Sequence, residues 1–151
     1  MKHPFRFPFR SPFRWMALVT LALALLAEAA VAATSLSAPE ALDKLEAQEV
    51  TLVDIRTPRE WRQTGVASGA LRIDMTDKRF VQQLLDAVNG DRNAPIVLIC
   101  RTGNRTGYVM GELKKLGFGN VSHVAEGMAG SAAGPGWIKR GLPVEQCGQG
   151  C

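Results

Sequence analysis

One apolar stretch constrains the fold of this chain more than any other feature. Residues 96–99 are Ile-Val-Leu-Ile, and no polar residue alternates with them. A strand of this composition is covered on both of its faces, as the strands of parallel sheets are. Six residues, 100–105, separate it from a helical pattern over 106–116. The chain is therefore expected to build an α/β fold around this strand.

The rest of the chain alternates strands with helices. Strands are predicted over 50–55, 71–75, 96–99 and 120–124, and a turn is predicted over 65–69. Helices are predicted after Ser37 and Thr57, from Asp77 onward, and over 106–116. Ser37 and Thr57 each precede a proline and an acidic residue, which is typical of a helix N-terminus. This order predicts a doubly wound parallel sheet with helices on both faces.

Residues 1–33 have the pattern of a secretory signal peptide. Pro-Phe-Arg occurs three times before residue 15, and a thirteen-residue apolar run follows this basic flank. Such a run is too short to span a bilayer comfortably, and the small residues at 30–33 predict cleavage after Ala32 or Ala33. An uncleaved N-terminal anchor is the alternative. We therefore expect an exported, periplasmic or secreted chain, with a signal peptide (1–33), one domain (34–146) and a Cys-containing tail (147–151).

The charge of the expected mature chain limits its partners. The formal net charge of the sequence is +4, but four of its eighteen basic residues precede residue 15. Without residues 1–33, fourteen basic and thirteen acidic residues remain, which gives 14 − 13 = +1. A nearly neutral chain has no basic footprint for duplex nucleic acid or for an anionic membrane surface. Neither partner is expected once the signal peptide has been removed.

The segment after the apolar strand carries the predicted chemistry. Cys100 ends the strand, and open α/β sheets bind ligands at the carboxyl ends of their strands. In a short loop before a helix, backbone N–H groups can converge on the sulfur, and Arg101 and Arg105 add positive charge. These surroundings favour the reactive thiolate, and Gly103 lets the loop adopt positive φ. The alternative is a core cysteine followed by a basic turn.

Three motifs in the same order resemble the rhodanese family of sulfurtransferases, over nearly all of residues 36–146. Residues 100–105 match the family's Cys-Arg-x-Gly-x-Arg loop and precede a hydroxyl residue, Thr106. Residues 52–61 look like the family's Asp-x-Arg strand end and following helix, and residues 126–143 resemble its C-terminal signature. Val66 departs from the pattern, because the family often has a histidine there. Three ordered motifs are specific where one would be weak.

The resemblance implies a rhodanese-like domain that transfers sulfane sulfur through a persulfide on Cys100. The donor would be thiosulfate, a polysulfide or a persulfide, and the acceptor would be cyanide or a thiol. Asp54 is expected to pair with Arg105 and support the loop, or else to face the helix that starts at Thr57, and Arg56 is expected to bind a loop carbonyl or an acid. The predicted anion cradle consists of Arg101, Thr102, Gly103, Asn104, Arg105 and Thr106. No cofactor or metal is expected, and the expected partners are a small sulfur-containing anion or thiol and a protein sulfur donor or acceptor.

Two other functions share these features. A sulfur carrier or redox partner would use the same thiol without turning over a small donor. A Cys-based phosphatase or arsenate reductase also cradles an oxyanion, but it uses Cys-x5-Arg, one residue longer than the spacing of Cys100 and Arg105. His123, in a predicted strand, is expected to be a core or surface histidine rather than a catalytic base.

The tail adds two further cysteines. Cys147 and Cys151 are separated by three residues, two of them glycine, so a disulfide between them is predicted in an exported chain. The alternative is a redox or resolving pair that reaches Cys100 or attacks its persulfide.

Overall fold

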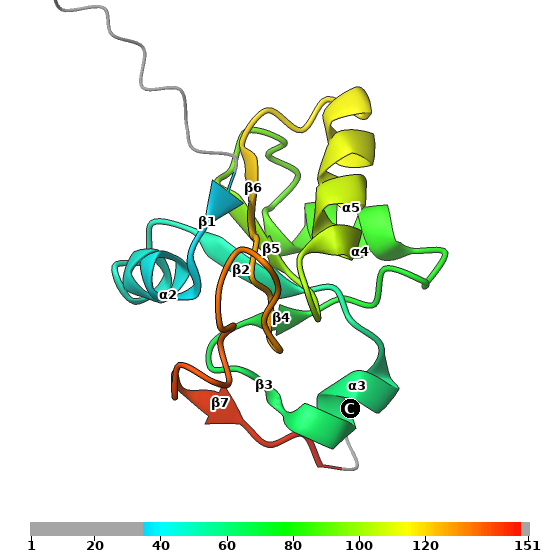
Figure 1. Cartoon of the computed structure of the whole chain (residues 1–151). Coiled ribbons are helices and arrows are strands. Elements are labelled where there is room, and N and C mark those ends of the chain that lie inside the picture. The colour runs from blue at the N-terminus through cyan, green and yellow to red at the C-terminus, as the bar shows by residue number, and fades with distance from the viewer. Residues whose placement is uncertain (1–34, 149–151) are drawn as a thin grey trace, which may run out of the picture. The chain divides into compact units, whose positions relative to one another are not determined.

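A five-stranded parallel sheet forms the centre of the computed structural model, which describes residues 35–148 (Figure 1). Its strand order is β1-β6-β5-β2-β4, and every neighbouring pair is parallel. The strands are β1 (Ser35–Leu36), β2 (Thr51–Asp54), β4 (Leu71–Arg72), β5 (Ile96–Ile99) and β6 (Val121–Val124). The apolar strand β5 thus lies in the middle, buried at every residue, as its sequence predicts.

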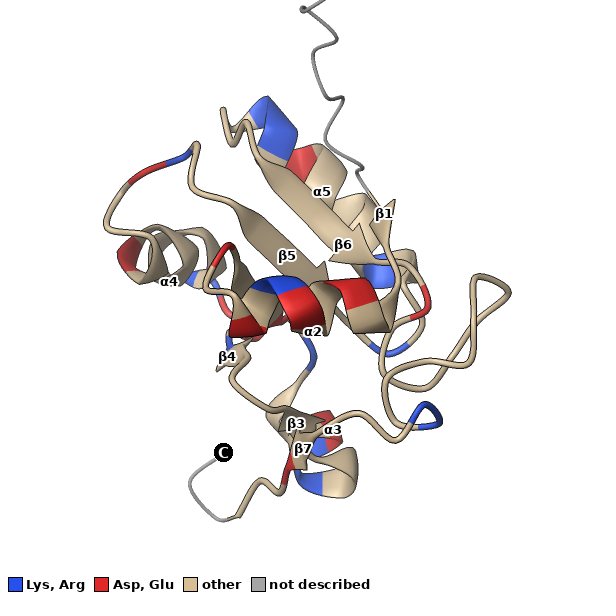
Figure 2. Cartoon of the chain, turned by 90° about the vertical axis from the view of Figure 1, so that its left-hand side faces the viewer, with Lys and Arg blue, Asp and Glu red and all other residues tan. Residues whose placement is uncertain are grey.

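Helices cover both faces of this sheet. Helices α4 (Phe80–Ala87) and α5 (Asn104–Lys115) pack on one face and α2 (Ala38–Glu46) packs on the other, whereas α3 (Pro58–Thr64) follows the end of β2 and lies away from the sheet faces (Figure 1). Leu84 of α4 and Leu113 of α5 pack in one core cluster with Leu98 of β5, while Ala41 of α2 and Trp137 pack in a second cluster. The outer surface of α2 is mainly acidic (Figure 2). The predicted doubly wound α/β fold is confirmed.

The starts of the helices follow their sequence signals with two differences. Ser37 and Thr57 are N-caps with complete capping boxes, and a proline follows each. Asp77 does not open α4, which begins at Phe80; its side chain accepts a hydrogen bond from the backbone of Arg79 in the turn before the helix. The helix predicted from 106 begins at Asn104, so that three residues of the predicted cradle form its first turn.

A second, two-stranded sheet was not expected from the sequence. Strand β3 (Val66–Ala67) pairs antiparallel with β7 (Val144–Glu145), where only a turn over 65–69 was predicted. Strand β1 was also missed, and the strand predicted over 71–75 is confined to Leu71–Arg72. Strands of two residues show neither alternation nor an apolar run, so their sequences carry no periodic signal.

The termini of the chain fall outside this description. The predicted signal peptide, residues 1–33, and Cys151 lie outside the described residues. Among residues 35–148, no helix is long and apolar enough to cross a membrane.

Candidate active site

Cys100 lies directly after the central strand β5 and is completely buried. The segment after β6 holds the loop from one side by two backbone hydrogen bonds. Met128 N donates to the Cys100 carbonyl at 2.8 Å, and Ala129 N donates to the Arg101 carbonyl at 2.9 Å. The position of the sulfur is therefore fixed by the sheet on one side and by residues 128–129 on the other.

Two glycines permit this close approach of backbones. Gly103 has φ of 85°, as predicted, and a Cβ there would lie 2.0 Å from the Ala125 carbonyl oxygen. Gly127 has φ of 63°, and a Cβ there would lie 2.7 Å from the Cys100 carbonyl oxygen. A side chain at either position would therefore force the loop and the segment after β6 apart.

Helix α5 starts immediately behind the loop. Its N-cap residue, Gly103, has no side chain to accept from the first backbone amides. Thr106, in the first turn, is buried and donates from Oγ1 to the Gly103 carbonyl at 2.7 Å. The Cys100 Sγ lies 3.8 Å from the same Oγ1. The uncapped N-terminus and the hydroxyl can together stabilise negative charge at the sulfur.

Arg105 pairs with Glu60 of α3, so its predicted pairing with Asp54 is wrong. Arg105 Nη1 donates to Glu60 Oε2 at 2.8 Å, and Nη2 donates to Oε1 at 2.5 Å. These hydrogen bonds lower the pKa of Glu60 from 4.5 to about 2. The pKa of Arg105 is raised chiefly by Glu60, and a smaller part of the rise comes from charge and hydrogen bonding at Cys100. The guanidinium therefore joins α5 to α3 and contributes positive charge near the thiol.

Asp54 is unavailable to Arg105 because Arg56 occupies both of its carboxylate oxygens. Arg56 Nε donates to Oδ1 at 2.9 Å, and Nη2 donates to Oδ2 at 2.6 Å. Arg56 Nη2 also donates to the Gly65 carbonyl at 2.7 Å, and Nη1 donates to Thr64 Oγ1 at 2.7 Å. Both charged side chains are buried. Arg56 was expected to bind a loop carbonyl or an acid, and it binds both.

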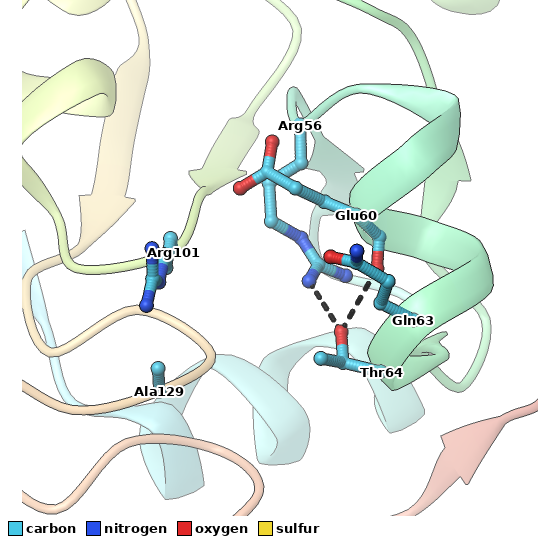
Figure 3. A pocket seen from close by; sticks show the side chains of 6 residues that line it. All are labelled: Arg56, Glu60, Gln63, Thr64, Arg101 and Ala129. Carbon is cyan, nitrogen blue, oxygen red and sulfur yellow. Dashed lines mark hydrogen bonds between the residues drawn. The ribbon is translucent and has the colours of Figure 1, made fainter.

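A cavity of about 220 Å³ lies between α3 and the loop (Figure 3). Arg101, which is exposed, lies across the cavity from the side chains of α3. The lining residues are Arg56, Glu60, Gln63, Thr64, Arg101 and Ala129. Sequence reasoning did not single out the three α3 residues, although the helix start after Thr57 was predicted. The cavity adjoins the cysteine loop through Arg101 and carries a guanidinium that can bind an anion.

The structure brings the remaining predicted cradle residues to the same place. Thr102 is half-buried in the loop, and the exposed Asn104 opens α5. Among residues 35–148, no group of three His, Cys, Asp or Glu side chains is arranged to hold a metal ion.

The described tail cysteine lies elsewhere. Cys147 Sγ accepts a hydrogen bond from Arg72 Nη1 at 3.2 Å, in a smaller cavity of about 80 Å³. Because Cys151 lies outside the described residues, the disulfide between the two stays a prediction.

Comparison with known proteins identifies the family. A model of the rhodanese-like domain matches residues 37–133, and the chain therefore belongs to the rhodanese-like family. A protein of Allochromatium vinosum named sulfurtransferase is 30% identical over 99 residues, which are 66% of this chain and 81% of that protein. These similarities place the chain in the general sulfurtransferase class.

Solved structures agree with this assignment. The 30 kDa polysulfide-sulfur transferase homodimer of Wolinella succinogenes aligns with a TM-score of 0.59 and 25% identity, over 89% of this chain and 89% of that chain. A protein of M. tuberculosis aligns with a TM-score of 0.61 over 75% of this chain and 97% of that chain. It is 24% identical and supports the fold alone.

Proposed function

We propose that this chain transfers sulfane sulfur from a small anionic donor to a thiophilic acceptor through a persulfide on Cys100. The position of Cys100 carries the proposal. It is the first residue after the central strand, its sulfur is close to Arg105, and the uncapped N-terminus of α5 follows within the same short loop. This arrangement supports a nucleophilic thiolate that receives and releases one sulfur atom.

With thiosulfate as donor, the reaction has two balanced steps. The Cys100 thiolate attacks the outer sulfur, an S–S bond to Cys100 forms, the S–S bond of thiosulfate breaks, and sulfite leaves with the electron pair. Cyanide then attacks the terminal persulfide sulfur, the Cys100 S–S bond breaks, and thiocyanate leaves while the thiolate is restored. No external oxidant or reductant is consumed in either step.

The surrounding groups would each serve one part of this cycle. The exposed Arg101 at the cavity would bind the anionic donor. Arg105, held by Glu60, would stabilise charge on the departing sulfite, and the first amides of α5 would stabilise the persulfide anion. The cavity of about 220 Å³ beside Arg101 gives the donor a place to bind before attack.

Intact-mass measurement tests the proposal directly. The mature protein is incubated with thiosulfate, its mass is recorded, and cyanide is added while thiocyanate is assayed. We expect a gain of one sulfur atom that cyanide removes, and no gain in Cys100→Ser, because an alcohol does not form the persulfide. Thiocyanate turnover by Cys100→Ser would refute the mechanism.

Parallel samples separate the other candidate functions. Polysulfide and a persulfidated protein replace thiosulfate in two samples, and an aryl phosphate ester tests for phosphatase activity. Sulfur gained from protein persulfide without turnover of small donors would indicate a carrier. Phosphate release without any sulfur gain would indicate a phosphatase. A Cys147→Ser, Cys151→Ser double variant shows whether the tail cysteines take part.

We further propose that the chain acts outside the cytoplasm after its leader is removed. The basic flank, the short apolar run and the small residues at 30–33 support this location. Cell fractionation and the N-terminal sequence of the recovered protein test it. An N-terminus at Ala33 or Thr34 in the periplasmic or secreted fraction is expected, and full-length chain in the cytoplasm would contradict it.

A further inference from the structure

His123 contacts the candidate active site from the neighbouring strand. It lies on β6, and the β5–β6 register places it beside Leu98, two residues before Cys100. Its half-buried ring brings Nδ1 to 2.9 Å from Oγ1 of Thr106. The same Oγ1 is the one that lies 3.8 Å from the Cys100 sulfur. A chain of polar atoms therefore runs from the sheet to the thiol.

Hydrogen-bond accounting fixes which ring nitrogen carries the proton. Thr106 Oγ1 lies 2.7 Å from the Gly103 carbonyl oxygen, which can only accept, so the single hydroxyl hydrogen is required there. If Nδ1 lacked a hydrogen, either this contact or the contact with His123 would join two acceptors. Both contacts are satisfied when His123 Nδ1–H donates to Oγ1 and Thr106 donates to Gly103.

This arrangement also determines what the hydroxyl can do when the thiol ionises. In the thiol form, the Cys100 S–H points to Oγ1. In the thiolate or persulfide form the sulfur becomes an acceptor, and the Thr106 hydroxyl can share its hydrogen between the Gly103 carbonyl and the sulfur. His123 donates to a lone pair of Thr106 Oγ1. The Thr106 hydroxyl therefore does not donate its own hydrogen to the imidazole. Donation to Oγ1 also polarises the hydroxyl and makes it a better donor.

We propose that His123 is a positioning residue for Cys100, acting through Thr106: its Nδ1–H orients and polarises the hydroxyl that stabilises the sulfur anion. The consequence for turnover rests on the proposed sulfurtransferase function. The effect on the reactivity of the thiol does not, because it precedes any reaction with a sulfur donor.

The electrostatic surroundings agree with a neutral donor. Burial is the main cause that lowers the pKa of His123, and a hydrogen bond with the Gly103 backbone opposes it. The ring is therefore uncharged at neutral pH and acts through its N–H rather than as a cation. Across the site, Arg105 carries the positive charge near the sulfur, and its partner Glu60 carries the negative one.

Two substitutions of His123 test the inference by the alkylation of Cys100 with iodoacetamide as a function of pH. His123→Leu removes the donor, whereas His123→Asn keeps an N–H near the position of Nδ1. For the Leu variant we expect alkylation about fivefold slower near neutral pH, which corresponds to one lost hydrogen bond, and an inflection at higher pH. The Asn variant should stay within about twofold of the parent, because the donor is restored.

The Thr106→Val background shows whether the effect passes through the hydroxyl. If it does, His123→Leu causes no further loss in that background, whereas independent effects would multiply. Ser122→Ala is the matched control, because the preceding residue on β6 faces the opposite side of the sheet. Thermal unfolding verifies that each variant is folded. Should Thr106→Val not fold, the comparison of Leu with Asn decides alone.

The outcomes separate this inference from the proposed function. Equal alkylation of the Leu, Asn and parent proteins would overturn the role of His123, whatever their sulfur chemistry. Slower alkylation of the Leu variant with rescue by Asn would support it even if no sulfur donor reacts. A full fivefold loss on adding His123→Leu to Thr106→Val would also overturn it, because His123 would then act by another route.

Discussion

Two arginine–carboxylate pairs hold α3 in place, and they lie in different surroundings. Asp54 and Arg56 are 0% and 2% exposed in their side chains, whereas Glu60 and Arg105 are 23% and 33% exposed. Asp54 and Arg56 are two residues apart at the end of β2, while Glu60 and Arg105 join α3 to α5 across forty-five residues. The first pair is local in sequence and buried, which we call the buried pair. The second is distant in sequence and partly exposed to solvent, which we call the open pair.

The difference indicates different tasks. Arg56 uses Asp54, Thr64 and the Gly65 carbonyl to hold the C-terminal end of α3 to the end of β2, where removal of Asp54 would leave a buried charge. Glu60 caps the first turn of α3 through Thr57 and also binds Arg105 beside the thiol. The buried pair Asp54–Arg56 therefore holds α3 in place. The open pair Glu60–Arg105 then positions the Arg105 guanidinium relative to α3.

The largest effect is expected from breaking the buried pair. Asp54→Ala should destabilise the fold by about 3–5 kcal/mol, because Arg56 would remain buried without its carboxylate. Denaturant unfolding monitored by circular dichroism measures this change. A loss below about 1 kcal/mol, the range of exposed pairs, would mean that Arg56 reaches solvent or another acceptor.

Breaking the open pair should affect reactivity more than stability. Glu60→Gln removes the negative partner of Arg105 while leaving an amide that can still cap Thr57. We expect sulfur transfer to fall about tenfold, since the guanidinium is no longer held beside the sulfur, with an unfolding loss of about 1 kcal/mol or less. Initial rates and unfolding midpoints are compared in one preparation. A stability loss as large as that of Asp54→Ala would erase the distinction between the pairs.

Replacing each arginine by lysine tests the difference between the two pairs with a smaller chemical change. Lysine keeps the charge but not the two parallel N–H bonds that Arg105 makes to Glu60. Arg105→Lys should lower transfer about threefold, less than Glu60→Gln, because a cation stays near the sulfur. Arg56→Lys is the matched variant and should mainly lower the unfolding midpoint. Equal activity losses in both variants would contradict the assignment of Arg105 to reactivity and of Arg56 to stability.

The sequence was informative where a pattern extends over several residues. The uninterrupted apolar run of β5, the capped starts of α2 and α3, and the order of three motifs predict the sheet, two helix starts and the family. The partner of Arg105 was mispredicted because proximity at the sheet edge suggested Asp54. The side-chain geometry that lets Arg56 take both oxygens of Asp54 has no signature in the spacing.

His123 and Glu60 were missed as site residues for a related reason. Each has a sufficient local explanation, as a strand histidine and as the acid of a capping box. Their second contacts, to Thr106 and Arg105, depend on how α5 packs beside β6 and α3. A single sequence indicates the first kind of role and leaves the second to tertiary structure.

The smallest expected effect is a change in the free energy of unfolding at low pH, and its sign follows from the pKa of Glu60. Folding lowers that pKa from 4.5 to about 2, chiefly because Arg105 donates to the carboxylate. The folded chain then binds fewer protons than the unfolded chain, so the pair contributes stability above about pH 4.5 and loses it as the pH falls toward about 2. Partial exposure of both side chains reduces this contribution.

We therefore expect the parent protein to lose slightly more unfolding free energy than Glu60→Gln between about pH 5 and about pH 2.5. Carboxyls that titrate in both proteins cancel in the difference, so unfolding curves measured in parallel isolate Glu60. Parallel pH dependences would mean that the pair is already open in solution. A steep difference would instead mean that it is held as firmly as Asp54 and Arg56, and that Arg105 is fixed before any donor binds.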